Sequence, residues 1–163
     1  MSHLENDSVK RVQAALADAG SEAKVMELAD TARSAKDAAA SIGTELGSIV
    51  KSLVFTVGGQ PVMALVSGDR NCREDQLPRV FNLKGEVKRA DADAVKAATG
   101  FSIGGVAPVG MAGPMPVAID VGLKRFETVY AAAGHPHCVF PTSAAELRRM
   151  TDGLISYAIA SEA

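Results

Sequence analysis

The residue with the clearest chemical potential is a lysine inside SIVKSLVF, residues 48–55, a stretch that predicts a β-strand. Side chains alternate along a strand, so Lys51 shares one face with Ile49, Leu53 and Phe55. An ammonium on such an apolar face loses hydration unless an anion or another polar group meets it. A lysine can also lay its stem on apolar surface and place its head in water. The pattern therefore leaves two interpretations: an anion or carbonyl site, and a solvated surface lysine.

A second informative segment, residues 100–116, contains five glycines and three prolines and has little regular pattern. Because Gly104 and Gly105 lack side chains, a ligand can approach their backbone N–H groups closely. Such donors bind oxyanions and phosphates. The spacing matches neither the dinucleotide motif G-x-G-x-x-G nor a P-loop. The alternative is a chain that only needs turns here.

Two of the three histidines lie beside a cysteine, in the stretch AGHPHCVFP. His135 and His137 offer two metal ligands, but no H-E-x-x-H or C-x-x-C pattern supplies more. Neighbouring residues on a strand point to opposite faces, so His137 and Cys138 make a poor catalytic pair. A small buried cysteine is the more common situation. We therefore expect no metal and no thiol nucleophile. Asp120, two residues before Gly122, favours a turn.

Composition indicates one ordinary globular domain. The chain has 163 residues, 47% of them hydrophobic and 22% charged, with a formal net charge of −2. This charge excludes a broad basic surface for nucleic acid, and a 4% aromatic content disfavours a base-stacking surface. The polar N-terminus is not a secretory signal, and no apolar run approaches a membrane span. With only two cysteines, a reduced, cytoplasmic protein is expected.

The periodicity predicts helices flanking a run of strands, which favours an α+β fold with a mostly antiparallel or mixed sheet. An antiparallel hairpin is expected from 49–57 and 61–66, turned by Gly58, Gly59 and Gln60. The other expected strands are 22–28, 85–90, 117–119, 128–133, 138–140 and a final strand 154–160. The expected helical segments are 7–19, 31–43, 73–82, 92–99, 121–126 and 143–151.

Several blocks in this order resemble the YbaK/ProX family of free-standing aminoacyl-tRNA deacylases, relatives of the editing domain inserted in bacterial prolyl-tRNA synthetase. The blocks are IVKSLVF, the G-x-x-x-P segment in TGFSIGGVAPVG, and VAID followed by LKRFETVYAAAGHPHCV. The resemblance covers about residues 28–160. It implies one editing domain over 1–163, with a mixed, mostly antiparallel, barrel-like sheet flanked by helices and preceded by the helix 7–19.

The resemblance implies hydrolysis of the ester that joins a wrong amino acid to the 3′-terminal adenosine of tRNA. Lys51 would be the essential lysine, and the loop glycines would donate backbone hydrogen bonds to the aminoacyl carbonyl. His137 occupies a position that is often asparagine in related proteins, so this chain departs from the family there. The resemblance assigns catalytic roles to Lys51, Gly104 and Gly105, and substrate-binding roles to Ser52, Pro108, Gly134 and His137.

The implied partner is the acceptor end of an aminoacyl-tRNA, expected to be tRNA-Pro carrying alanine, cysteine, serine or threonine. A prolyl-tRNA synthetase is a candidate second partner; no cofactor, DNA or membrane partner is expected. Two alternatives stay open: a non-catalytic module that binds aminoacyl-tRNA or a synthetase, and a His-x-His metalloprotein.

Overall fold

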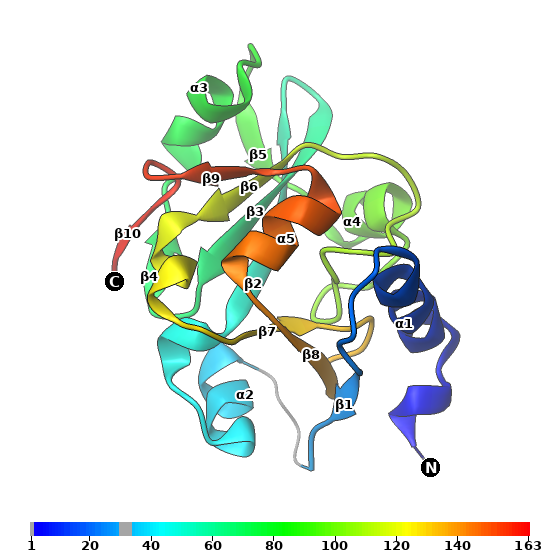
Figure 1. The fold of residues 1–163 in the computed structure, drawn as a ribbon. Coiled ribbons are helices and arrows are strands. Elements are labelled where there is room, and N and C mark those ends of the chain that lie inside the picture. Colours follow the sequence, from blue (N-terminus) through cyan, green and yellow to red (C-terminus); the bar gives the residue numbers. More distant parts are fainter. Residues whose placement is uncertain (1, 30–33) are drawn as a thin grey trace.

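A computed structural model describes residues 2–29 and 34–163. Its centre is a five-stranded sheet in the order β5-β2-β3-β6-β9 (Figure 1). The strands are β5 (Val87–Arg89), β2 (Val50–Val57), β3 (Gln60–Ser67), β6 (Val117–Asp120) and β9 (Leu154–Ser156). Strand β2 pairs antiparallel with β3 and β5, whereas β6 runs parallel to both β3 and β9. The predicted hairpin is therefore confirmed as the β2–β3 pair.

Two smaller antiparallel sheets complete the strands. One has the order β1-β8-β7, and the other is the pair β10-β4. Their strands are β1 (Met26–Glu27), β8 (Cys138–Thr142), β7 (Val129–Ala132), β10 (Ala160–Glu162) and β4 (Arg70–Cys72). The predicted α+β class with a mixed, mostly antiparallel arrangement is confirmed. Within the described ranges the strands stay in three separate sheets, so the sheet is not closed into a barrel.

In the part of the chain that the structure describes, five α-helices surround the sheets, and their caps follow from local sequence. They are α1 (Asp7–Asp18), α2 (Ala35–Ile42), α3 (Leu77–Phe81), α4 (Ala92–Thr99) and α5 (Ala144–Thr151). The side chains of Ser34, Asp91 and Ser143 each accept a backbone N–H in the first turn of the helix that follows. None of the helices in residues 2–29 and 34–163 is long and apolar enough to cross a membrane.

Both faces of the central sheet are buried, which explains the alternation along β2. Val50 and Val54 belong to one apolar cluster, together with Leu147 of α5, which lies across that face in Figure 1. Phe55 and Val57 belong to a second cluster on the opposite face, which α3 covers. Successive β2 side chains therefore enter different cores, as the period of two requires.

The predicted final strand, 154–160, is wrong as a single element. The chain instead makes β9 and β10, which belong to different sheets. Between them the Ala158 N–H donates to Ser156 Oγ at 3.1 Å, and Tyr157 is 80% exposed. A serine side chain that accepts a backbone N–H two residues on makes a turn, which ends the strand.

Other boundaries differ by smaller amounts. The expected strand 22–28 shrinks to β1, and β4 is an additional strand that the pattern did not predict. The expected helix 7–19 ends one residue earlier, at Asp18. In the expected helix 31–43, residues 31–33 lie outside the described residues, and the remainder forms α2 behind its Ser34 cap.

Candidate functional site

A cavity of about 460 Å³ lies along the free edge of β2. Strand β5 pairs only with the Phe55–Val57 part of β2, and an isolated bridge joins Ile49 to Tyr130 of β7, so within the described sheets the stretch between these two contacts has no strand paired on that side. Five regions line the cavity: α2 and its cap, β2, the end of β5, the glycine-rich loop, and the β7–β8 region. Three of the sequence-predicted site residues meet in it, namely Lys51, Ser52 and Gly104.

The free edge of β2 presents polar groups to this cavity. Ala90 N–H donates to the Val54 carbonyl at 3.2 Å, which shows that the backbone of Val54 faces the β5 side. The direction alternates along an antiparallel strand, so the N–H and carbonyl of Ser52 face the same side, beyond the end of β5. Ser52 Oγ is buried without a hydrogen-bond partner among the described residues. Buried polar atoms are normally paired, so this edge is suited to a polar ligand.

Lys51 is half-buried, and its ammonium donates a hydrogen bond to the carbonyl of Arg70 on β4. Burial lowers the pKa of Lys51, and the acidic groups of Cys72, Asp69 and Asp120 oppose that shift. An ammonium has three donors, and the Arg70 carbonyl uses one of them. Lys51 can therefore offer hydrogen bonds and positive charge to a ligand.

The two loop glycines have different environments. Gly104 lines the cavity with φ +96°, a backbone conformation that residues with a side chain rarely adopt. Gly105 N–H donates to the Ser102 carbonyl at 3.0 Å, so this donor is engaged in a turn. A Cβ on Gly105 would lie 2.8 Å from the backbone nitrogen of His135. Gly104 therefore faces the cavity, while Gly105 lets the loop touch the turn before β8.

Gly134 and His137 are not among the residues that line this cavity. Gly134 has φ +90° and packs against α1, where an added Cβ would lie 2.7 Å from the Ser8 carbonyl oxygen. The ring of His3 stacks on those of His135 and His137, with centroids 4.1 and 4.7 Å away. In the part of the chain that the structure describes, no group of three or more His, Cys, Asp or Glu residues is arranged to hold a metal ion.

Cys138 lines the cavity, but its side chain is fully buried. Burial raises the pKa of the Cys138 thiol to about 11. The thiolate is the nucleophilic form of cysteine, so this side chain is almost entirely in its unreactive form at neutral pH.

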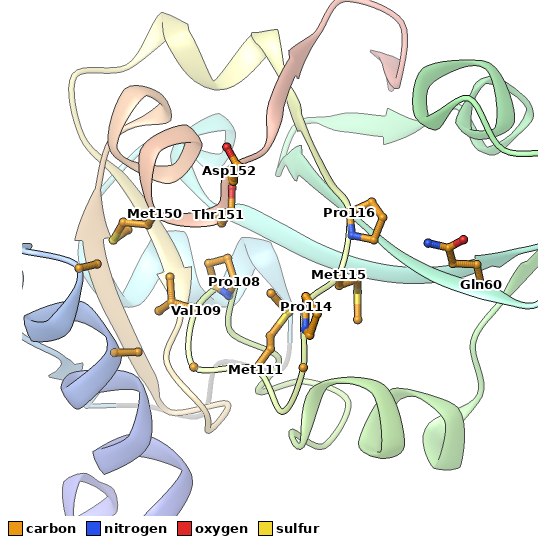
Figure 2. Close-up of a pocket in the computed structure, with 14 residues that line it drawn as sticks. Gln60, Pro108, Val109, Met111, Pro114, Met115, Pro116, Met150, Thr151 and Asp152 are labelled. Carbon is orange, nitrogen blue, oxygen red and sulfur yellow. The ribbon is translucent and has the colours of Figure 1, made fainter.

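A larger cavity of about 810 Å³ is lined by the second part of the glycine-rich loop together with residues of α1 and α5 (Figure 2). Pro108 lines this cavity and not the one beside Lys51. Met111, Met115 and Met150 contribute much of its apolar wall, and Asp152 borders it. Its described lining contains no lysine, arginine or histidine, so nothing there attracts the phosphate of a nucleic acid. The Lys51 cavity is thus the better candidate site.

Sequence reasoning missed Arg89 beside Lys51, and it left Arg70 open between a phosphate contact and a solvated surface charge. Arg89 lines the Lys51 cavity, because β5 pairs with β2 so that Arg89 is opposite Phe55. Arg70 reaches Lys51 through its backbone carbonyl. Only the pairing register of β5 with β2 would have placed Arg89 in the cavity. The Lys51–Arg70 contact uses a backbone carbonyl, which every residue has, so the residue type at position 70 does not indicate it.

Comparisons with known proteins show the family to which this chain belongs. The family model described as "Aminoacyl-tRNA editing domain" matches residues 29–150. The protein YwhH of Bacillus subtilis (strain 168), described as uncharacterized, is 32% identical over 141 residues, 86% of this chain and 88% of that protein. The proline–tRNA ligase of Geobacter sp. (strain M21) is 35% identical over 101 residues, 62% of this chain but only 18% of the ligase.

Among solved structures, one described as a candidate trans-editing enzyme for prolyl tRNA synthetase superimposes with a TM-score of 0.88 and 36% identity. The match covers 97% of this chain and 99% of that one. The predicted family and the predicted enzyme class, an aminoacyl-tRNA deacylase, are therefore confirmed: the chain belongs to the aminoacyl-tRNA editing domain family.

Proposed function

We propose that this chain acts in trans to hydrolyse the ester of a small, mischarged amino acid on tRNA-Pro. The observation that carries the proposal is the cavity along β2, where Lys51, Ser52 and Gly104 meet at a free strand edge. The similarity to a stretch of proline–tRNA ligases and to a candidate trans-editing enzyme for prolyl tRNA synthetase supports tRNA-Pro as the substrate. A prolyl-tRNA synthetase is the proposed second partner.

The site residues take different roles. The Lys51 ammonium holds negative charge, either at the phosphate–ribose of the terminal adenosine or at the ester. The backbone of Gly104 donates to the aminoacyl carbonyl, and the unpaired hydroxyl of Ser52 binds a polar group of the substrate. Gly105 and Gly134 do not touch the substrate. Gly105 allows the loop to contact the turn before β8, and Gly134 allows that turn to contact α1. Pro108 stiffens the same loop.

The reaction needs no nucleophilic side chain. Water attacks the ester carbonyl carbon, the bond from that carbon to the ribose oxygen breaks, and a free amino acid and a tRNA hydroxyl result. An aminoacyl ester is already reactive, so positioning of water and stabilisation of the oxyanion supply much of the acceleration. The neighbouring ribose hydroxyl of the substrate transfers the proton. The high pKa of Cys138 is consistent with this route.

The cavity walls favour a small, neutral amino-acid side chain. Ile103, Val106 and Val139 line it together with Tyr130, and its volume of about 460 Å³ is at the lower end of typical ligand sites. Synthetase pockets separate amino acids of similar size poorly, and a second hydrolytic site removes the errors. Alanine, cysteine, serine and threonine are therefore the proposed side chains.

The test is deacylation of tRNA-Pro charged with each of these four amino acids and, as the cognate control, with proline. Wild type, Lys51→Ala and Lys88→Ala are compared. Lys88 is an exposed lysine on β5 that pairs only loosely with Glu86, at 3.9 Å. We expect hydrolysis of one or a few mischarged species, a fall of about 10²-fold or more in Lys51→Ala, and no change in Lys88→Ala.

Two results would contradict the proposal. One is the absence of hydrolysis of every species by folded wild-type protein, which would favour a binding module. The other is a Lys51→Ala variant as active as Lys88→Ala, since the lysine would then have no part in the reaction.

A further inference from the structure

We propose that Arg70 and Asp120 are positioning residues that fix the Lys51 ammonium for the reaction. This inference rests on the proposed function, because it assumes that Lys51 acts on the substrate. Neither Arg70 nor Asp120 lines the cavity, so both act through Lys51.

The support begins at a buried carboxylate at the end of β6. Asp120 is 0% exposed, and its two oxygens are oriented by backbone donors. Oδ1 accepts the Gly122 N–H at 2.8 Å, and Oδ2 accepts the Ser67 N–H at 3.1 Å. The carboxylate therefore has a fixed direction. Its buried charge requires a cation, because an unpaired ion in this position is costly.

Arg70 supplies that cation and is held on three sides. Its Nε forms an ion pair with Asp120 Oδ2 at 3.2 Å that is not aligned as a hydrogen bond, and a second guanidinium nitrogen donates to the Ala160 carbonyl at 3.0 Å. The arginine stem lies against Gly122, where an added Cβ would be 2.7 Å from Arg70 Cδ. The side chain thus joins β6, β4 and β10 at one point, and the Arg70 backbone is fixed by its own side chain.

The fixed backbone in turn fixes the lysine. Lys51 donates to the Arg70 carbonyl, so the position of β4 sets the position of the ammonium. The charged or titratable groups that act on Lys51 are Cys72 on β4, Asp69 in the turn before it, Asp120 on β6 and Arg89 on β5. Asp69 is already paired with Arg125 at 2.7 Å. The Asp120–Arg70 pair is therefore the ion pair that connects the central sheet, through the Arg70 backbone, to the Lys51 ammonium.

The experiment compares Arg70→Met with Arg73→Met. Arg73 is an exposed arginine near the same strand, and it contacts Asp75 at 3.6 Å. In Arg70→Met we expect kcat for the mischarged tRNA to fall about tenfold or more while KM stays within about twofold, because the lost interaction orients a group that acts in the transition state. Arg73→Met should match wild type, and Arg70→Lys should recover part of the rate.

A second readout reports on Lys51 without using activity. Lys51 is labelled by reductive methylation of the native protein, and the modified fraction is measured by peptide mass spectrometry. Release from the Arg70 carbonyl should increase the labelling rate of Lys51 in Arg70→Met and leave it unchanged in Arg73→Met. Thermal denaturation verifies that each variant is folded; if Arg70→Met is not, Arg70→Gln takes its place in both assays.

The two readouts must change together. A folded variant with wild-type kcat, or one with reduced kcat and unchanged Lys51 labelling, overturns the positioning role. If wild type hydrolyses no species, the proposed function fails, and the labelling comparison alone decides whether Arg70 fixes Lys51.

Discussion

Burial shifts the pKa values of Lys51 and Cys138, the ammonium and the thiol of the candidate site, in opposite directions. It lowers the pKa of Lys51 and raises that of Cys138, so in each case it favours the neutral form. For Lys51 the nearby carboxylates of Asp69 and Asp120 oppose the effect, which supports the charged form. For Cys138 the nearby carboxylate of Glu27 adds to the effect and disfavours the thiolate. Nearby acidic groups therefore offset part of the burial effect on the Lys51 ammonium, whereas at Cys138 they add to it.

This contrast predicts that Cys138→Ala keeps its deacylation rate within about twofold of wild type, since a protonated thiol is a poor nucleophile. The variant should lose about 1–2 kcal/mol of stability, because a fully buried sulfur is removed from the core. Initial rates and urea denaturation measure the two quantities. A folded but inactive Cys138→Ala would show that the thiol takes part in the reaction.

At the scale of elements, the glycine-rich loop is shaped by backbone contacts. A Cβ on Gly105 would lie 2.8 Å from His135 N and 2.9 Å from the Gly134 carbonyl carbon, and backbone atoms cannot rotate out of the way. We expect Gly105→Ala to lower the free energy of unfolding by about 1–3 kcal/mol. Deacylation should weaken as well, since the loop carries Gly104.

Gly113→Ala is the matched control for this substitution. Gly113 belongs to the same loop, and nothing lies within 4 Å of an added Cβ there. Its stability should be unchanged or rise by up to about 1 kcal/mol, because alanine restricts the unfolded chain. Urea denaturation of both variants checks the pair. Equal stabilities would mean that the loop does not depend on the close contact at Gly105.

The elements that sequence predicted well are those whose causes are local. The β2–β3 hairpin follows from alternation and a glycine turn, and α2 and α4 begin at Ser34 and Asp91, whose side chains cap them. The parallel pairings of β6 and the pairing of β4 with β10 join distant segments and have no local signal. The prediction of a single last strand over 154–160 was wrong because a hydrogen bond to the Ser156 side chain makes a turn there, and the apolar pattern of this segment does not indicate that turn.

The candidate site shows the same division. Lys51 and Gly104 were recognisable because an apolar strand and a glycine-rich segment make them unusual, and both line the predicted cavity. Pro108 lines the other cavity, and the His137 ring lies among histidines outside the Lys51 cavity. The roles of Arg70 and Asp120 depend on contacts over 50 or more residues, which one sequence does not reveal.

At the scale of the whole molecule, a histidine cluster ties the N-terminal segment to the turn between β7 and β8. His3 stacks on His135 and His137, and its backbone N–H donates to the Glu27 carboxylate on β1. Burial lowers the pKa of His135, and the proximity of His3 and His137 adds to the shift. Protonation of His135 therefore opposes this packing.

The sign of the pH effect follows from linkage. Unfolded histidine titrates near pH ~6.5, so below that pH the unfolded chain binds the proton that folded His135 resists. Stability should therefore be complete above pH ~6.5 and decline on acidification until the lowered pKa of His135 is passed. Thermal denaturation between pH ~7.5 and ~5 measures this decline, which lies above the range where carboxylates titrate.

His135→Gln is the variant that isolates this group, and it should show a shallower decline than wild type over the same interval. Parallel curves for the two proteins would assign the pH dependence to other groups.

The contact between Arg70 and the Ala160 carbonyl also has a consequence for biogenesis. Ribosomes build a chain from its N-terminus, and β4 finds its partner β10 only once residues 160–162 have been made. A nascent chain that ends before them contains Lys51 and the whole glycine-rich loop, yet its β4 is unpaired and the Arg70 guanidinium lacks one of its anchors. Because β10 follows the other described strands in the chain, the support of Lys51 is completed only after those strands have been synthesised. A stalled or truncated translation product therefore carries the site residues without the scaffold that aligns them.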